Sequence, residues 1–191
     1  MQSQIKSMIS ESLEIRSMCA ALAPQIENAA ILLIKALKNN KKIILAGNGG
    51  SATQASHIAA EFTGRYKLER KALPAIALTT DIAAITAIAN DYGFDAVFER
   101  QIEALGNNGD VLIALTTSGN SANIIKAVEK AKKMNIHVIG LLGKDGGKMK
   151  NTSDIEMIIP SDNTPQIQEA HLMVLHIICE LVEKELFGKG K

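Results

Sequence analysis

The stretch that decides the fold is KIILAGNGGSATQ, residues 42–54. A short apolar run leads straight into a glycine-rich turn, and apolar residues at helical spacing follow. This order is typical of a buried parallel strand that feeds a helix. Four further apolar runs, each followed by turn residues and a helical segment, lie at 75–78, 111–115, 137–142 and 155–159. The alternation predicts an α/β fold: an open, parallel, five-stranded sheet with helices on both faces.

Residues 1–40 precede the first strand and carry apolar positions at helical spacing. They predict two N-terminal helices with a break at Pro24. Because this segment has no strand beside it in the sequence, we expect it to serve in oligomerisation, with the α/β core at 41–188 and all 191 residues in a single domain. For the last helix we predict Thr164 as the N-cap and Pro165 as the first helical residue.

Composition excludes several classes of protein. The net charge is +1, from 21 basic and 20 acidic residues, so nucleic acid is not an expected partner. No signal peptide is apparent, and Asp81 interrupts the most continuous apolar stretch, so we expect no membrane segment. Cys19 and Cys179 sit in apolar helical patterns and are expected to be buried thiols in a reducing compartment, the cytoplasm.

The glycine turn at 47–51 is a candidate ligand loop. Glycines allow a ligand to approach the backbone, and a helix N-terminus attracts an anion. Ser51 and Gln54 have the spacing of a capping box. Two alternatives remain: a tight turn with no ligand, or a dinucleotide fingerprint with Asp81 on a ribose. The fingerprint positions are Gly47, Gly49 and Ala52.

A second candidate loop ends the third strand, at 116–121. Its four hydroxyls and one glycine precede a helix and form a neutral cradle for a phosphate monoester. No lysine follows as in a triphosphate loop, and a simple capping turn would need only one or two hydroxyls. Because a dinucleotide enzyme has no evident use for a second phosphate cradle here, we expect no nucleotide cofactor.

Side chains suited to proton transfer or metal binding fall on two helices. His57 and Glu61 are four residues apart and share a helix face, although such pairs are commonly solvated surface pairs. The last helix carries the other candidates: Gln168, Glu169, His171 and His176. The stretch 90–93, NDYG, reads on its own as a helix stop.

Six motifs in order together resemble the phosphoheptose isomerases of the sugar isomerase (SIS) fold, from about residue 42 to 186. They are GNGGS, HIAAEFTGR, AIANDYGF, TTSGNS, GKDGGKM and IQEAHLMVLH. The resemblance implies a flavodoxin-like sheet and a homotetramer with sites at subunit interfaces. It also implies an aldose–ketose isomerase that converts sedoheptulose 7-phosphate to D-glycero-D-manno-heptose 7-phosphate, the first step of activated heptose synthesis for surface polysaccharide such as lipopolysaccharide core.

The resemblance also implies roles for individual residues. Glu61 and His176 would carry the proton transfers, and one Zn²⁺ per subunit would be bound by His57, Glu61, Gln168 and His176. The substrate would be bound by Asn48, Gly49, Gly50, Ser51, Glu61, Asn90, Asp91, Thr116, Thr117, Ser118, Ser121 and Gln168. Such an isomerisation proceeds through an enediol and needs a carboxylate base and a second acid/base group, which these residue types supply.

Three points qualify the resemblance. Gln168 and His176 are eight residues apart, about 12 Å along a helix, so we hypothesise that a complete site draws side chains from more than one subunit. Gln166 stands where relatives commonly have Arg, and Gln54 where Asp or Asn is frequent. The main alternative is a non-catalytic SIS-fold protein that associates with the replication initiator DnaA; the presence of both Glu61 and His176 favours the enzyme.

Overall fold

The computed structural model describes residues 1–188, so positions 189–191 of the predicted domain lie outside the described residues. Five parallel strands form one sheet in the order β2-β1-β3-β4-β5. The predicted α/β fold is confirmed, and each predicted strand lies within a residue or two of its observed place. The strands are β1 (Ile43–Ala46), β2 (Ala75–Ala77), β3 (Val111–Thr116), β4 (His137–Gly143) and β5 (Ile155–Ile159).

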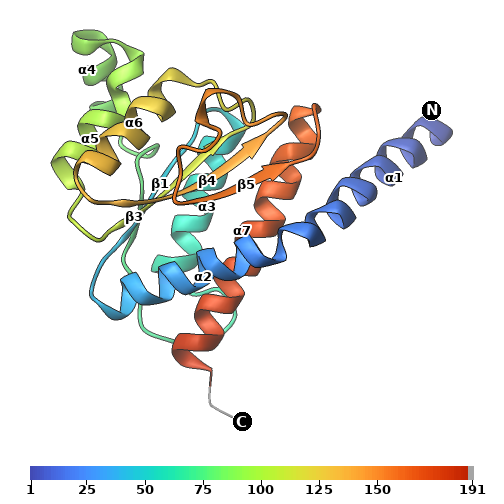
Figure 1. The fold of residues 1–191 in the computed structure, drawn as a ribbon, viewed down its shortest axis with the longest axis horizontal. Helices are drawn as coiled ribbons and strands as arrows, with labels where there is room; N and C mark the ends of the chain where they lie inside the picture. The colour runs from blue at the N-terminus through green and yellow to red at the C-terminus, as the bar shows by residue number, and fades with distance from the viewer. Residues whose placement is uncertain (189–191) are drawn as a thin grey trace.

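Helices cover both faces of the sheet (Figure 1). Alternate residues of a strand point to opposite faces, so Ile43 and Leu45 pack with α2, α3 and α7, while Ile44 and Ala46 pack with α5 and α6. The helices are α1 (Gln2–Met18), α2 (Ala23–Lys38), α3 (Gly50–Thr63), α4 (Ile82–Tyr92), α5 (Val97–Leu105), α6 (Ala122–Lys133) and α7 (Thr164–Phe187), with short 3₁₀ turns at Cys19–Leu22, Phe94–Ala96 and Gly147–Met149.

The strand order places a topological switch between β1 and β3. From β1 the chain crosses through α3 to β2 on one side, and then returns through α4 and α5 to β3 on the other side. The loops after β1 and β3 therefore lead into helices on opposite faces and leave a crevice between them. In open α/β sheets this is where ligands bind. Both loops chosen from the sequence, 47–51 and 116–121, lie at this point.

The N-terminal segment differs from the prediction in where its helices break and in what α2 contacts. The break between its helices is the 3₁₀ turn Cys19–Leu22, and Pro24 lies within the first turn of α2, where its missing N–H leaves no bond unmade. Buried residues of α2, among them Ala29, Ala30 and Leu33, belong to the main core. The second part of the segment 1–40 therefore belongs to the α/β core, because α2 packs on the sheet of its own chain.

Helix α1 differs from α2 because it buries none of its residues and projects from the body of the molecule (Figure 1). An exposed apolar stripe runs along it, made of Ile5, Met8, Ile9 and Leu13. The helical stretch Gln2–Lys38 is long and apolar enough to meet a length-and-composition test for a membrane span. Part of this stretch, the apolar face of α2, packs in the core, and a single helix of this kind is weak evidence of a membrane span.

Helix α7 begins one residue earlier than predicted, and both cysteines are buried. Asn163, not Thr164, is the N-cap of α7, which puts Pro165 at the second helical position. Cys19 and Cys179 are both free and buried, as predicted. Burial raises the pKa of the Cys179 thiol to about 12, so this sulfur stays protonated and unreactive.

Candidate functional site

Helices α3 and α7 lie beside each other and run in the same direction. The Gln168 carboxamide lies over Gly50 near the start of both helices, and seven to eight residues further on His176 meets His57. The later turns of α7 then carry Glu183, which binds the chain that follows α3. Side chains far apart in the sequence are therefore brought together along this seam.

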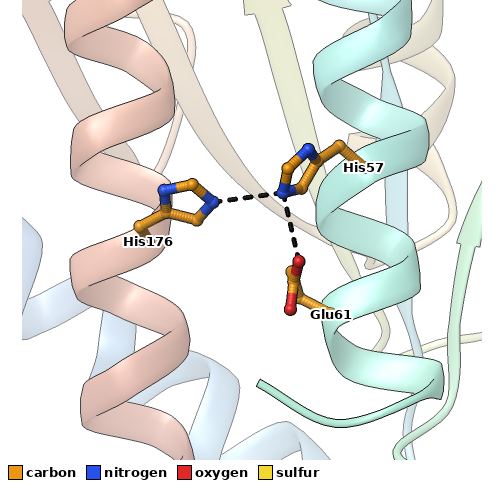
Figure 2. Close-up of side chains that lie close together, drawn as sticks. All are labelled: His57, Glu61 and His176. Carbon is orange, nitrogen blue, oxygen red and sulfur yellow. Dashed lines mark hydrogen bonds and ion pairs between the residues drawn. The ribbon is translucent and has the colours of Figure 1, made fainter. Parts of the chain in front are cut away.

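The central cluster of the seam consists of His57 and Glu61 from α3 and His176 from α7 (Figure 2). The Nε2 atoms of the two histidines are 3.2 Å apart, and His57 Nε2 is 3.1 Å from Glu61 Oε1. One ligand atom from each residue lies within 4.8 Å of the others. The residues predicted for acid/base chemistry thus meet within one chain.

The same cluster has the donors of a zinc site. Two imidazole nitrogens and a carboxylate oxygen are a common zinc ligand set, and on a tetrahedral ion with bonds near 2.0 Å two such donors lie about 3.3 Å apart. The observed separations of 3.2 and 3.1 Å match that spacing. The three side chains fit the ion that the family resemblance implies.

The surroundings of His176 within the cluster lower the pKa of its imidazole. Burial lowers the pKa of the His176 imidazole, the neighbouring His57 lowers it further, and the Glu61 carboxylate opposes both. A lowered pKa favours the neutral imidazole, which keeps one nitrogen lone pair for a metal or a proton.

A buried polar network behind the cluster was missed by sequence reasoning. The Glu183 carboxylate accepts hydrogen bonds from the backbone N–H groups of Tyr66, Lys67 and Leu68 and from Arg70 Nε. Although burial raises it, these four bonds hold the pKa of Glu183 below its usual value. Arg70 in turn donates to carbonyls at the end of α3, including that of Glu61. No local pattern marks this pair, because its members are 113 residues apart.

The network also places an aromatic ring beside the cluster. The Tyr66 ring stacks on the His176 imidazole, with centroids 5.7 Å apart and planes inclined by 28°. The backbone of Tyr66 is fixed by Glu183. The orientation of His176 is thus supported from the segment that follows α3.

The hydroxyl loop after β3 is the loop predicted to bind a phosphate. Ser121 is the N-cap of α6, yet its hydroxyl makes no capping bond among the described residues; it lies 3.1 Å from the Thr116 hydroxyl. Gly119 has φ 65°, and a Cβ there would collide with the carbonyl oxygen of Gly146. The loop is therefore closely packed at Gly119, and the Ser121 hydroxyl does not cap the helix.

The glycine loop after β1 departs from one expectation. Helix α3 begins at Gly50 with Gly49 as its N-cap, so the predicted capping box of Ser51 and Gln54 is wrong. Gln54 Nε2 instead donates to the Gln168 carbonyl oxygen at 2.6 Å. A Cβ on Gly50 would lie 2.6 Å from the Gln168 carboxamide, so the glycine makes room for that side chain.

Gln168 therefore lies away from the His57–Glu61–His176 cluster of its own chain. It contacts α3 at Gly50, and His57 is seven residues further along that helix, about 10 Å. This spacing agrees with the distance argument drawn from the sequence. It puts Gln168 beside the glycine loop instead.

The remaining candidates occupy other positions. His171 is fully buried, with Nε2 3.0 Å from the Leu142 carbonyl oxygen, and Glu169 pairs with Arg16 of α1. Asn90 and Asp91 lie exposed at the end of α4 with their side chains bonded to each other, and Gly93 ends that helix as predicted. Asp81 caps α4 by accepting from the Ala84 N–H at 2.9 Å, which gives this carboxylate a structural role as an N-cap.

Comparison with known proteins identifies the family. Residues 9–143 match the family described as SIS domain. Over 185 residues the chain is 53% identical to a phosphoheptose isomerase of Helicobacter pylori, a match that covers 97% of this chain and 93% of the relative. The chain belongs to the phosphoheptose isomerase family. Two solved phosphoheptose isomerases share its fold: that of Neisseria gonorrhoeae at 43% identity with a TM-score of 0.90, and that of Francisella tularensis at 41% with 0.93, each match covering 96% of this chain and 98% of the other.

Family membership settles the general activity. As a phosphoheptose isomerase family member the chain is an aldose–ketose isomerase that acts on a sugar phosphate. The relatives do not support the alternative of a non-catalytic DnaA-associated protein. Because they match over nearly their whole length, the isomerase family accounts for the entire chain.

Proposed function

We propose that the enzyme interconverts sedoheptulose 7-phosphate and D-glycero-D-manno-heptose 7-phosphate through an enediol. The observation that carries the proposal is the meeting of the Glu61 carboxylate and the His176 imidazole in one cluster, two to three turns along α3 from the glycine loop. A seven-carbon phosphosugar is an elongated ligand: its six C–C bonds of about 1.5 Å span roughly 7.5 Å when extended, and the phosphate lengthens it further.

Proton transfer is assigned to Glu61 and His176. Glu61 takes the proton from the carbon next to the carbonyl and returns it to the neighbouring carbon, so the pair of electrons moves from C–H bond to enediol and back without an external redox partner. His176 exchanges a proton with the two substrate oxygens, which alternate as carbonyl and hydroxyl. Its lowered pKa suits this role, because a neutral imidazole has one nitrogen to accept and one N–H to donate.

Substrate binding is assigned to the two loops at the switch point. The hydroxyls of Thr116, Thr117, Ser118 and Ser121, with the N-terminus of α6, would hold the phosphate. A neutral cradle suits a phosphate that must be bound and released. Sugar hydroxyls would contact the glycine loop and the other proposed ligands: Asn48, Gly49, Gly50, Ser51, Asn90, Asp91 and Gln168.

Zinc is proposed as the metal of the cluster, held by His57, Glu61 and His176 of one chain, with Gln168 supplied by another subunit. When bound, the ion would polarise a substrate oxygen and stabilise negative charge on it. His176 Nε2 cannot ligate the ion and transfer a proton at the same time. The two proposed roles of His176 are therefore alternatives at any instant, and removal of the metal separates them.

The deciding experiment incubates the purified protein with sedoheptulose 7-phosphate, with and without a chelator, and detects the aldose product by chromatography and mass spectrometry. We expect product in the untreated sample. Loss of most activity in the chelated sample, with recovery on added Zn²⁺, would assign His176 Nε2 to the metal. Full activity after verified metal removal would assign His176 to proton transfer alone. Absence of product in every arm would contradict the proposed reaction.

We further infer that the enzyme is a cytoplasmic homotetramer in which α1 joins the subunits. The exposed stripe of Ile5, Met8, Ile9 and Leu13 supports this, because apolar side chains on a projecting helix are stabilised by a partner. Deleting residues 1–18 should leave the α/β core folded, since α1 buries none of its own residues. Light scattering should then give a mass below four subunits, while circular dichroism keeps the signal of a folded protein; an unchanged tetramer would contradict the role of α1.

A further inference from the structure

A pair of asparagines joins the two ligand loops across the switch point. Asn48 lies in the glycine loop after β1, and Asn123 lies in the first turn of α6, directly after the hydroxyl loop. Asn48 Nδ2 donates to Asn123 Oδ1 at 2.9 Å, and Asn123 Nδ2 donates to Asn48 Oδ1 at 2.9 Å. The two residues are 75 positions apart in the sequence.

Asn123 is a polar residue buried in the first turn of α6, where an apolar residue would be expected to stabilise the fold more. It is 3% exposed, and the next buried residues of α6, Ile124 and Ala127, belong to the apolar core. A buried carboxamide destabilises the fold unless it is hydrogen-bonded, and among the described residues the Asn123 carboxamide bonds to one loop side chain, that of Asn48. Neither bond supports secondary structure.

The reciprocal pairing fixes how the Asn48 carboxamide is turned. If either group flipped alone, the two oxygens would face each other and so would the two amino groups, and both bonds would be lost. Held as it is, Asn48 keeps one N–H and one oxygen lone pair for another partner. A side chain that can recognise a sugar hydroxyl is thereby presented in a fixed orientation beside the hydroxyl loop.

We propose that Asn123 is a positioning residue for sugar recognition, which acts on the substrate only through Asn48. This inference rests on the proposed function, because it takes Asn48 as a ligand of the sugar. Asn123 itself does not contact the substrate. Its pairing makes the orientation of the sugar-binding loop depend on the position of the phosphate-binding loop, so the two halves of the substrate are recognised by one connected unit.

The test is a double-mutant cycle with Asn48→Ala, Asn123→Ala and the double variant, read by calorimetric binding of sedoheptulose 7-phosphate and of inorganic phosphate, and by kcat and KM. We expect Asn123→Ala to weaken sedoheptulose 7-phosphate binding roughly tenfold, the size expected when a neutral hydrogen-bonding group is misplaced, with kcat changed less than KM. Inorganic phosphate should bind as before. In the Asn48→Ala background, Asn123→Ala should change nothing further.

Two variants control for folding. Asn123→Ser keeps a polar group at the site and should fall between wild type and Asn123→Ala; it also serves if the alanine variant does not fold. Asn39→Ala removes an asparagine whose side chain bonds within the end of α2, just before the amino end of β1 and so at the other end of the strands from the ligand loops. This variant should match wild type.

The outcomes are distinct. Additive losses in the cycle would overturn the proposal, as would equal weakening of phosphate and sugar phosphate, which would mark a collapsed loop. Binding of sedoheptulose 7-phosphate without turnover would contradict the proposed reaction and leave the cycle to decide the role of Asn123. No binding by the wild-type protein would overturn both.

Discussion

Within the cluster, the Glu61 carboxylate is the group on which the proposed proton transfer depends. Glu61 contributes an oxygen 3.1 Å from His57 and is the carboxylate of the cluster. Glu61→Gln keeps the size of the side chain and removes its basicity. We expect kcat to fall about a thousandfold with a much smaller change in KM, because general base catalysis contributes roughly 10² to 10⁴.

The measurement is initial-rate kinetics with the sugar phosphate, together with a thermal unfolding curve. Glu129→Gln offers a matched control: Glu129 is exposed on α6, which packs on the opposite face of the sheet from α3. That control should keep wild-type kinetics. A Glu61→Gln enzyme within tenfold of wild type would remove Glu61 from the role of base.

His171 predicts a pH dependence of stability. Burial lowers the pKa of this imidazole to about 4 from 6.5, against the raising effect of its bond to the Leu142 carbonyl. The folded protein therefore keeps His171 neutral, while the unfolded chain takes up a proton near pH 6.5. The stabilising contribution is complete above pH 6.5 and is lost as the pH falls toward 4, by at most about 3 kcal/mol.

Urea unfolding of wild type and His171→Gln between pH 7.5 and 4.5 measures this contribution. Glutamine retains an N–H donor and does not titrate in this range. The free energy of unfolding of wild type should fall more steeply below pH 6.5 than that of the variant. Parallel curves would mean that His171 is not the group responsible.

At the scale of elements, the buried Arg70–Glu183 pair fastens the end of α3 to α7. The two side chains are 1% and 3% exposed, and the carboxylate also binds three backbone N–H groups. Glu183→Gln removes the negative charge and places an NH₂ group, itself a donor, facing N–H groups that now donate to the carboxylate. Breaking such a buried pair costs about 3 to 5 kcal/mol, so we expect a loss of about that size in the free energy of unfolding.

A surface pair between α2 and α7 provides the control. Lys38 and Glu185 lie 3.5 Å apart with side chains 56% and 60% exposed. Glu185→Gln should cost less than about 1 kcal/mol, because exposed pairs are screened by solvent. Urea denaturation measures both variants, and similar losses would show that burial does not set the value of the Arg70–Glu183 pair.

At the scale of the whole molecule, the positions of Gln168 and His176 predict how subunits share a site. Glu61 and His176 meet within one chain, whereas Gln168 lies beside Gly50. If Gln168 of one subunit completes the cluster of another, a Gln168→Ala chain and a His176→Ala chain should complement each other. Random mixing of equal amounts leaves about a quarter of the sites intact, so we expect about a quarter of the wild-type activity.

The matched control mixes Glu61→Ala with His176→Ala chains. Both substitutions damage the cluster of the chain that carries them, so every cluster in the mixture is defective and no activity should return. Co-expressed, doubly tagged proteins assayed after tandem purification give the measurement. Without recovery in the Gln168→Ala mixture, Gln168 could not be a ligand shared between subunits.

The sequence by itself determined the sheet, the two ligand loops and the residue types of the site. Runs such as 111–115 are apolar throughout and are punctuated by glycine and hydroxyl residues, so burial and turn chemistry, which are local properties, fix where the strands end. Local spacing also put His57 and Glu61 on one face of a helix. It was less exact at helix starts, where Gly49 and Asn163 act as caps in place of the residues expected.

Only the tertiary structure decided which distant side chains meet. The pairing of His57 with His176 spans 119 residues, that of Arg70 with Glu183 spans 113, and that of Asn48 with Asn123 spans 75. These contacts depend on how far α7 is shifted along α3 and on how two loops face each other across the switch point. Packing of the core fixes both, and no local periodicity in the sequence records the alignment of one packed helix against another.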